Sequence, residues 1–360
     1  MTDRPEEQRP SRVPTTAPQE GEIRARWGWV EPMVWTERML ASLETGFEGG
    51  KWFRLIDKVW SPKNLGRSLE KVVAKGGSAG VDHQSVGQIK VRKDQTIAKL
   101  EQALRANQYQ PQAVKRVWIP KAGSKEKRPL GVPTLRDRMV QGALLHVIEP
   151  IFERDFAPQS YGFRPGKGGK DALRRVEELL KGGYGFEMVR YADDFILLCR
   201  NQEQAQKALE QVRRWVEENG LTLHPIKTRL VDTSLAGGFD FLGYHFERGR
   251  KWPRKKSMDK HKETIRSKTR RTEGRSMRAI CEDLNRSLRG WFEYFKHSKD
   301  HVFAPIDGYT RGRLRRILRK RLGKNGRGRG NDHHRWPNAY FSAAGLFSLR
   351  QAHAAACRSS

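Results

Sequence analysis

The sequence has little cysteine and no long apolar run. Its three cysteines lie far apart and form no pair motif: Cys199, Cys281 and Cys357. This spacing argues against disulfides and a cysteine-based zinc site, and it predicts a reduced, cytoplasmic protein. No apolar stretch is long enough to span a membrane, no lipidation motif is present, and the first residues lack the apolar core of a signal peptide. We therefore expect no membrane partner.

Acidic residues are also scarce relative to basic ones. The 360 residues include 71 Lys and Arg but only 41 Asp and Glu, which gives a formal net charge of +30. Such an excess attracts a polyanion, and nucleic acid is the obvious one. The length is sufficient for two or three domains.

One short stretch combines extended backbone with adjacent acidic residues. Residues 186–191 and 195–199 favour strands, and Ala192-Asp193-Asp194 between them fits a tight turn. Two adjacent carboxylates at a hairpin tip repel each other and have no neighbouring cation in the sequence. A Mg²⁺ ion would relieve this repulsion, because magnesium prefers carboxylate and phosphate oxygens. The alternative is a solvated turn without a ligand, since Asp-Asp turns are common.

Periodicity predicts the elements around this hairpin. Apolar residues recur at helical spacing over residues 135–156, 171–180, 280–295 and 303–322, and Asn201 is a suitable N-cap for a further helix that ends at Gly220. Strands are expected at residues 221–224, 228–231 and 238–246, and a basic hairpin at residues 114–132. Residues 1 to about 26 are polar and contain four prolines, which predicts a disordered tail.

Five further stretches, together with the YADD sequence at 191–194, resemble one protein family in that family's order. They are KRPLGVPT at 127–134, SYGFRPG at 160–166, GLTLHPIKT at 220–228, FLGY at 241–244 and RWPNAYF at 335–341. The chain is similar in these motifs to the group II intron reverse transcriptase/maturases, over roughly residues 45–355. Each motif alone is a weak signal, but their combination and order are specific to the family.

The resemblance implies an α+β fold with right-hand polymerase-like fingers and palm, the palm truncated, followed by an α-helical thumb/maturase domain. The expected divisions are a disordered N-terminal tail and extension at 1–45, fingers at 46–168, a truncated palm with the YADD hairpin at 169–250, a basic linker that contacts phosphates at 251–275, and the helical RNA-binding domain at 276–360. The zinc-bearing endonuclease domain of some relatives is not expected.

The resemblance also implies roles for individual residues. Asp193 and Asp194 match the catalytic residues that bind Mg²⁺, and Lys121, Arg128 and Lys227 match contacts to the incoming nucleotide. An Arg suits phosphate because its planar fork binds two oxygens at once. Judged from the residues alone, the basic hairpin could equally be a solvated edge that discourages sheet aggregation, and Lys227 could simply face solvent.

Template and primer contacts are expected at Arg164, Gly243 and Tyr244. Arg164 follows Tyr161 and Phe163 in a loop that could place the Arg on a nucleic-acid backbone and an aromatic ring on a base. The same loop could instead be a buried aromatic anchor. A glycine in the FLGY stretch permits a close backbone approach.

RNA contacts are expected on the helix over residues 303–322, which combines an apolar stripe with many basic residues. The residues expected to bind RNA are Arg311, Arg315, Arg316, Arg319 and Lys320. Charge runs are usually just solvated, but this density on a chain of charge +30 favours RNA. By resemblance the ligand is structured intron RNA.

The expected polymerase site is incomplete. Two Mg²⁺ ions roughly 3.5–4 Å apart require several carboxylates, and the family has a further Asp on the neighbouring strand and a GTPQG turn at the nucleotide pocket. Both are missing here, and the chain matches the family on either side of the Tyr184–Gly185 junction, which indicates an in-frame deletion, natural or from sequence assembly. Asp171, Glu177 and Glu187 do not stand where the missing Asp would be.

Two hypotheses about function follow. The first is an enzyme, a group II intron reverse transcriptase/maturase in which Asp193 and Asp194 hold metal and polymerise, with primer DNA and deoxynucleoside triphosphates as further partners. The incomplete site predicts that this polymerase activity is lost in this chain. The second is a non-catalytic protein that binds structured intron RNA, or a degenerate fragment. A homodimer, in which a second copy supplies the missing ligand, is a further alternative.

Overall fold

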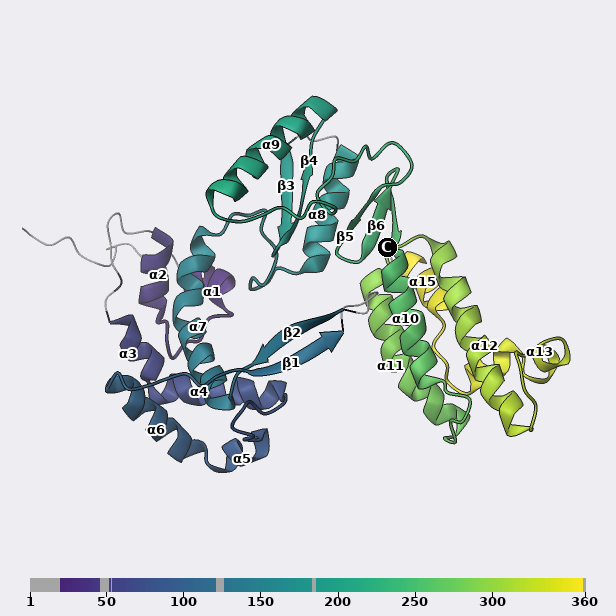
Figure 1. The fold of residues 1–360 in the computed structure, drawn as a ribbon, viewed down its shortest axis with the longest axis horizontal. Coiled ribbons are helices and arrows are strands. Elements are labelled where there is room, and N and C mark those ends of the chain that lie inside the picture. Colours follow the sequence, from purple (N-terminus) through teal and green to yellow (C-terminus); the bar gives the residue numbers. More distant parts are fainter. Residues whose placement is uncertain (1–19, 46–51, 53, 121–125, 183–185, 359–360) are drawn as a thin grey trace, which may run out of the picture. The chain divides into compact units, whose positions relative to one another are not determined.

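The computed structural model describes residues 20–45, 52, 54–120, 126–182 and 186–358, and it contains two compact units. The first unit ends at Ala157 and the second begins at Pro158, so the predicted division after residue 168 falls inside the second unit. Helices and small antiparallel sheets both occur, as expected for the α+β class (Figure 1). Within the described ranges, no helix is both long enough and apolar enough to cross a bilayer.

Helices form most of the first unit. They are α1 (Glu20–Trp27), α2 (Glu37–Thr45), α3 (Leu55–Trp60), α4 (Pro62–Lys75), α5 (Val86–Val91), α6 (Lys93–Arg105) and α7 (Leu135–Asp155). Helices α4 and α7 pack closely at the centre, where a Cβ on Gly142 would lie 2.2 Å from Ser68 Oγ. The Ser68 hydroxyl donates to Met139 O at 2.7 Å, so this contact is both tight and satisfied.

The N-terminal part of the first unit corrects one prediction. Residues 20–26, expected to belong to a disordered tail, lie in α1, where Ile23 and Trp27 are buried in the core. The indole Nε1 of Trp27 donates to Glu44 Oε1 at 2.6 Å, which joins α1 to α2. The tail prediction was wrong here because two apolar residues four apart are enough for one turn to pack. Residues 1–19 lie outside the described residues.

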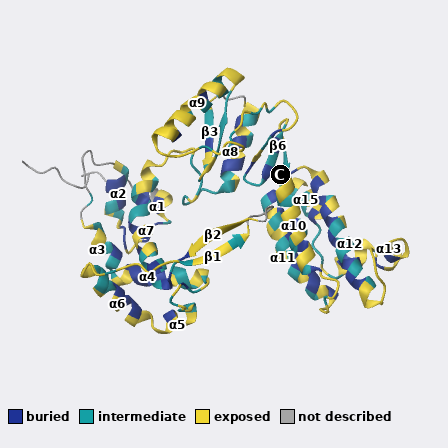
Figure 2. Cartoon of the chain, viewed as in Figure 1, coloured by how far each residue is buried: buried dark blue, intermediate teal, exposed yellow. Residues whose placement is uncertain are grey.

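The predicted basic hairpin is confirmed as β1 (Lys115–Pro120) and β2 (Lys127–Val132). The strands pair antiparallel from Lys115↔Val132 to Pro120↔Lys127. Figure 2 shows most of this ribbon as exposed, and only Val132 is buried. The tip, including Lys121, lies outside the described residues.

The second unit contains two small sheets and two groups of helices. The elements are α8 (Gly169–Gly182), β3 (Glu187–Tyr191), β4 (Asp194–Leu198), α9 (Gln202–Glu218), β5 (Phe239–Phe241), β6 (Tyr244–Glu247), β7 (Arg250–Pro253), α10 (Lys255–Lys268), α11 (Met277–Phe295), a 3₁₀ turn (Asp300–Val302), α12 (Phe303–Arg321), α13 (Asn331–Arg335), α14 (Asn338–Ala343) and α15 (Leu349–Arg358). One core joins α8 to the β3–β4 and β5–β6–β7 sheets, and another lies among α10, α11, α12 and α15.

Several predicted elements of this unit are confirmed and three are wrong. Asn201 caps α9, because its Oδ1 accepts from Gln204 N at 2.9 Å. Residues 221–224 and 228–231, predicted as strands, form no strand. Residues 251–275, predicted as a basic linker, contain the end of β7 and the helix α10, whose His261 and Ile265 are buried. The linker prediction was wrong because these two side chains, four residues apart, are enough to pack α10 against the core.

Candidate functional site

The YADD hairpin forms as predicted. Strands β3 and β4 pair antiparallel with Tyr191 opposite Asp194, and Ala192 takes the left-handed backbone conformation (φ 56°) that closes the turn. Asp193 and Asp194 are exposed. A cation does lie close to the tip, since Arg190 Nε donates to Ala192 O at 2.8 Å, although it bonds the backbone and not the carboxylates.

The loop at residues 159–164 lies directly against this tip. Tyr161 N donates to Arg190 O at 2.8 Å, and Arg190 N donates to Gln159 O at 2.9 Å, so the loop pairs with the free edge of β3. A Cβ at Gly162 would lie only 2.3 Å from Ala192 N. Glycine is therefore required at this position, because any side chain would force the loop off the turn. Sequence reasoning missed this contact, and Gly162 between two aromatic residues was its only signal.

The loop's aromatic residues differ in their surroundings. Phe163 is 85% exposed, which rules out the buried-anchor interpretation for this ring, and its centroid lies 6.2 Å from that of Tyr191. Tyr161 is partly buried, and burial raises the pKa of its hydroxyl. Arg164 Nη1 donates to Ser160 O at 2.8 Å, so the predicted template contact also braces its own loop.

A third carboxylate does not join Asp193 and Asp194. Among the residues that the structure describes, no group of three or more His, Cys, Asp or Glu side chains could hold a metal ion. The two aspartates could contribute to one Mg²⁺ shell completed by water and phosphate. They do not fit a site for two ions.

Each carboxylate considered in the sequence is engaged elsewhere. Asp171 Oδ2 accepts from Gly168 N at 2.9 Å at the start of α8, and Glu177 accepts from Lys251 Nζ at 2.6 Å. Glu187 lies four residues before Tyr191 on β3, about 13 Å away at ordinary strand rise, and faces Arg175 at 3.7 Å. None can complete the site. The Tyr184–Gly185 junction lies outside the described residues.

The FLGY stretch forms the β5–β6 turn, and it is packed against protein. Leu242 (φ 45°) and Gly243 (φ 86°) make a two-residue turn of the kind that favours positive φ. Tyr294 Oη donates to Leu242 O at 2.7 Å, and Ser257 Oγ donates to Gly243 O at 3.0 Å. The turn's carbonyls are thus held by α11 and α10.

Tyr244, predicted to contact template or primer, is a core residue. It is only 1% exposed, its hydroxyl donates to Tyr294 O at 2.6 Å, and burial raises its pKa. The prediction was wrong about its position because an aromatic next to a turn can pack inward as readily as outward. Tyr294 is itself partly buried, and this burial, together with the nearby Tyr191, raises the pKa of its hydroxyl.

The predicted nucleotide contacts stay predictions. Arg128 lies exposed on β2 in the first unit, and Lys227 lies exposed in a turn of the second unit. Lys121 lies outside the described residues. No interaction places Lys227 beside Asp193 or Asp194 within the part of the chain that the structure describes.

The basic helix α12 corrects the predicted RNA-binding face. Arg315 is 4% exposed, and it donates from Nε to Trp336 O and from Nη2 to Asn338 Oδ1, both at 2.9 Å. Its guanidinium carbon lies 5.1 Å from the Phe341 ring centroid. Burial lowers the pKa of Arg315 from its ordinary value. This side chain holds the domain together and is not available to RNA.

Two further arginines of α12 also point to internal partners. Arg319 Nη1 forms an ion pair of 2.5 Å with Asp332 Oδ2, and its Nε and Nη2 donate to Asn325 O. Arg311 lies 4.0 Å from Asp307 Oδ2. Arg316 is partly exposed and Lys320 exposed, and neither forms an ion pair among the described residues. Only these last two of the five predicted RNA contacts remain accessible without breaking such a pair.

Helix α10 and the turn after it present cations to solvent instead. The exposed basic residues that form no ion pair within the described ranges are Lys255, Lys256, Lys260, Arg270 and Arg271. Lys256 and Lys260 are four residues apart and so share one helix face. Phosphates of a nucleic acid could reach these side chains without displacing an internal partner.

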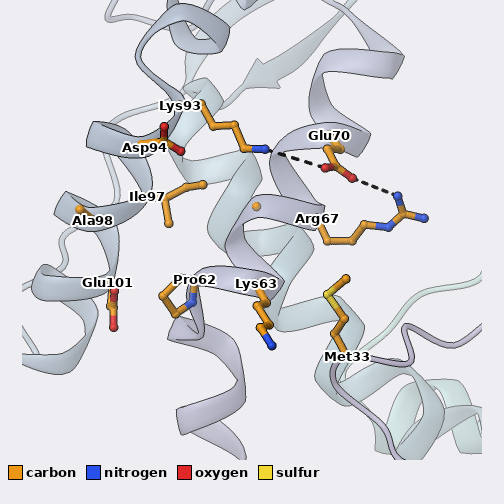
Figure 3. A pocket seen from close by; sticks show the side chains of 11 residues that line it. Met33, Pro62, Lys63, Arg67, Glu70, Lys93, Asp94, Ile97, Ala98 and Glu101 are labelled. Atoms are coloured by element: carbon orange, nitrogen blue, oxygen red, sulfur yellow. Dashed lines mark hydrogen bonds and ion pairs between the residues drawn. The ribbon is translucent and has the colours of Figure 1, made fainter.

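A groove in the first unit is lined by none of the predicted site residues. Its cavity measures about 490 Å³ between α4 and α6, and it has Ile97 and Ala98 on one side (Figure 3). Glu70 bridges Arg67 at 3.0 Å and Lys93 at 3.9 Å across it. Charges of both signs line the groove, so it has no preference for a polyanion.

Two family models match the second unit. The model for reverse transcriptase (RNA-dependent DNA polymerase) matches residues 170–246, which run from α8 through the YADD hairpin to β6. The model for the group II intron maturase-specific domain matches residues 258–336, from α10 to just beyond α13.

Named relatives agree with these matches but are covered only in part. Protein YkfC of Escherichia coli K12 is 38% identical over 126 residues, which cover 34% of this chain and 33% of that protein. Group II intron-encoded protein LtrA of Lactococcus lactis is 38% identical over 93 residues, covering 26% of this chain and 16% of LtrA. An uncharacterized 91 kDa protein in the cob intron of Schizosaccharomyces pombe is 31% identical over 146 residues, which cover 38% of this chain and 18% of that protein.

The aligned segments thus span about a third or less of each relative's length. Both halves of the second unit nevertheless match in the order expected from the motifs, the first to a reverse transcriptase and the second to a maturase domain. The second unit is thus similar first to reverse transcriptases and then to the maturase-specific domain of group II introns.

Proposed function

We propose that this chain binds structured group II intron RNA and assists its folding or splicing, as a maturase does, and that it has lost templated DNA synthesis. Its architecture is a right-hand polymerase with a truncated palm and a helical thumb/maturase domain. The observation that carries the proposal is a contrast within one unit. The maturase-matched helices share a core and carry exposed cations, whereas no third carboxylate joins Asp193 and Asp194 among the residues that the structure describes.

RNA binding is supported by the position of the charges. Lys255, Lys256 and Lys260 lie on the exposed side of α10, whereas His261 and Ile265 face the core. Arg270 and Arg271 follow in the next turn and extend the cationic surface. Cations that are neither buried nor paired can neutralise phosphates and release their counterions, which supplies salt-sensitive affinity.

The loss of synthesis is supported by the chemistry of the tip. Extension of a 3′-hydroxyl needs one ion to activate the attacking oxygen and another to stabilise the leaving group. Two adjacent aspartates without a bridging carboxylate can contribute to holding only one ion. Loss of one preorganised electrostatic element typically costs about 10²–10³ in rate, and the expected nucleotide-pocket turn is missing as well.

Primer extension tests the catalytic half of the proposal. The full chain is incubated with a DNA primer on an RNA template, deoxynucleoside triphosphates and Mg²⁺, then Mn²⁺. We expect negligible extension, equal to that of the control with Asp193→Ala and Asp194→Ala. Robust extension that the double substitution abolishes would show an active polymerase, and a dimer by light scattering would then point to a second copy as the source of the missing ligand.

RNA binding is tested separately. A structured group II intron RNA and an unstructured RNA of equal length are titrated with the full chain over a range of salt concentrations. We expect tighter binding to the structured RNA and a steep loss of affinity with salt. Equal, weak binding to both would overturn the maturase assignment, whatever the result of primer extension.

A further inference from the structure

We propose that Phe163 is a stacking platform for an unpaired nucleobase beside the Asp193–Asp194 tip. The proposal rests on the proposed function as a nucleic-acid-binding protein, and it adds a binding residue and a ligand class to it. Single-stranded RNA or DNA can supply such a base, since every base has a π-face that stacks on an aromatic ring.

The first argument is that the apolar ring of Phe163 is exposed to solvent and its backbone conformation is unfavourable. Its side chain is 85% exposed, so it forgoes most of the stabilisation that burial of a large apolar side chain supplies. Its backbone is left-handed, with φ 57°, a conformation that is unfavourable for a residue with a Cβ. Strain of this kind at an exposed aromatic residue points to a function.

The second argument is that the loop cannot easily move the ring elsewhere. Two hydrogen bonds tie Gln159 and Tyr161 to Arg190 of β3, and Gly162 touches the backbone of Ala192. Phe163 follows directly, so its position relative to the tip is set by backbone contacts. A preformed ring loses little conformational freedom on binding, which favours affinity.

The third argument concerns the neighbours. The Phe163 ring lies 6.2 Å from that of Tyr191 at a tilt of 42°, so the two rings form one apolar surface next to the turn. Basic residues follow it closely in sequence, namely Arg164, Lys167 and Lys170, and Arg190 bonds the backbone of the same loop. An aromatic ring among cations suits a base together with the phosphates on either side of it.

A protein partner fits these observations less well. Stable protein interfaces bury on the order of 800 Å² on each partner, far more than one exposed ring offers. A single base covers the ring itself and leaves its charged phosphates to the basic neighbours. The occupant with matching size and charge is therefore a nucleotide of a single strand.

The experiment measures binding of the full chain to short RNA and DNA oligonucleotides of one sequence, with 2-aminopurine reporting stacking at successive positions. We expect Phe163→Ala to weaken binding roughly 5- to 150-fold, the equivalent of one lost stacked base. Phe163→Trp should keep the affinity and the quenching of one 2-aminopurine position, whereas Phe163→Leu should behave as the alanine variant does. The RNA and DNA arms show which strand supplies the base.

Phe186→Ala is the matched control. This Phe is 55% exposed and precedes the other end of β3, about 16 Å from Tyr191 at ordinary strand rise. It should bind as the unaltered chain does, and circular dichroism should show all variants folded. An oligonucleotide that lacks the base whose 2-aminopurine signal responds should bind Phe163→Ala no more weakly than the intact oligonucleotide does.

Three outcomes would overturn the proposal: unaltered affinity in Phe163→Ala, full affinity in Phe163→Leu, or additive losses from the missing base and the missing ring. Binding of structured intron RNA is measured in parallel. If that binding persists while the single-strand result fails, only the platform falls. If the chain binds neither RNA, the proposed function falls with it.

Discussion

Helices α10 and α12 carry similar densities of positive charge and use them in opposite ways. Six of the 14 residues of α10 and seven of the 19 residues of α12 are Lys or Arg. On α10 most of these side chains face solvent, whereas on α12 Arg313, Arg315 and Arg319 donate to carbonyls or carboxylates of neighbouring segments. Charge density therefore does not identify a nucleic-acid surface until the partners of each side chain are known.

The α12 arginines act as connectors between segments. Arg313 donates from Nη2 to Thr269 O at 2.6 Å, at the C-terminal end of α10, where the helix dipole favours a cation. Arg321 donates to the carbonyls of Glu273 and Arg275 in the turn that follows. Burial lowers the pKa of Arg313 from its ordinary value. An arginine that replaces water at several carbonyls stabilises the fold and leaves little for a ligand.

The largest expected effect is a loss of RNA affinity when the exposed lysines of α10 are removed. Combined substitution of Lys255, Lys256 and Lys260 by Ala should weaken binding of structured RNA on the order of 100-fold near physiological salt, because about three phosphate contacts are lost. The slope of log K against log salt should fall by about 2 to 3. Filter binding over a salt series measures both quantities.

The matched control for this change is Lys90→Ala, Arg92→Ala and Lys99→Ala. These exposed residues of the first unit remove the same charge from a different surface. An equal loss of affinity in both triple variants would mean that total charge, and not the α10 face, attracts the RNA.

The next largest effect concerns α12. Arg315→Ala removes the donors to Trp336 O and Asn338 Oδ1, and we expect about 2 kcal/mol of lost stability. For a unit of this size that lowers the Tm by roughly 4–8 °C. Thermal denaturation followed by circular dichroism measures the shift.

Arg316→Ala serves as the neighbouring control, since this partly exposed side chain forms no ion pair within the described part of the chain. Its stability should stay within about 0.5 kcal/mol of the unaltered protein. Should the two variants melt at the same temperature, the connector role of Arg315 is mistaken.

The smallest effect tests the buried side of α10. His261 is 5% exposed and stacks on Trp291 with ring centroids 4.6 Å apart, and burial lowers its pKa to about 4. As pH falls below 6.5 the unfolded chain takes up a proton that the folded chain cannot accept until about pH 4. Stability is thus lost as pH falls through this window. Between pH 7 and 5.5 the loss from this group should be about 1 kcal/mol.

Urea denaturation at the two pH values checks this expectation in the unaltered chain and in His261→Phe. The variant keeps an aromatic ring for Trp291 and should lose about 1 kcal/mol less on acidification. His146 of the first unit, whose pKa burial also lowers to about 4, is present in both proteins and cancels in the comparison. An identical pH dependence in the two proteins would show that His261 titrates normally.

Local structure in the second unit was predictable where a short stretch of sequence determines the secondary structure. The YADD hairpin follows from strand-forming residues on both sides of a turn, and α9 follows from its Asn201 cap and apolar stripe. Helix α10 was missed because its docked face has only His261 and Ile265 buried, too narrow a stripe to stand out among basic residues. Because this segment is densely basic, the sequence did not reveal a helix that buries only a small apolar face.

The candidate site was predictable in part. Residue types and order led to Asp193 and Asp194, and both lie exposed at the tip of the predicted hairpin. The inward position of Tyr244 and Arg315 could not be predicted, because it depends on partners 50 residues from Tyr244 and 21 or more from Arg315. The fixed contact of Gly162 with Ala192 is likewise a property of two segments that the sequence separates.

The bonded β5–β6 turn has a practical consequence for anyone who cuts this chain into fragments. Its two carbonyls accept from Tyr294, Ser257 and the backbone N–H of Arg254, all of which belong to the helical half. A fragment that begins at residue 251, the predicted domain boundary, would split β7 and leave these donors with water in place of their carbonyl acceptors. An expression fragment of the maturase region should therefore begin before Phe239, so that the sheet and helices stay together.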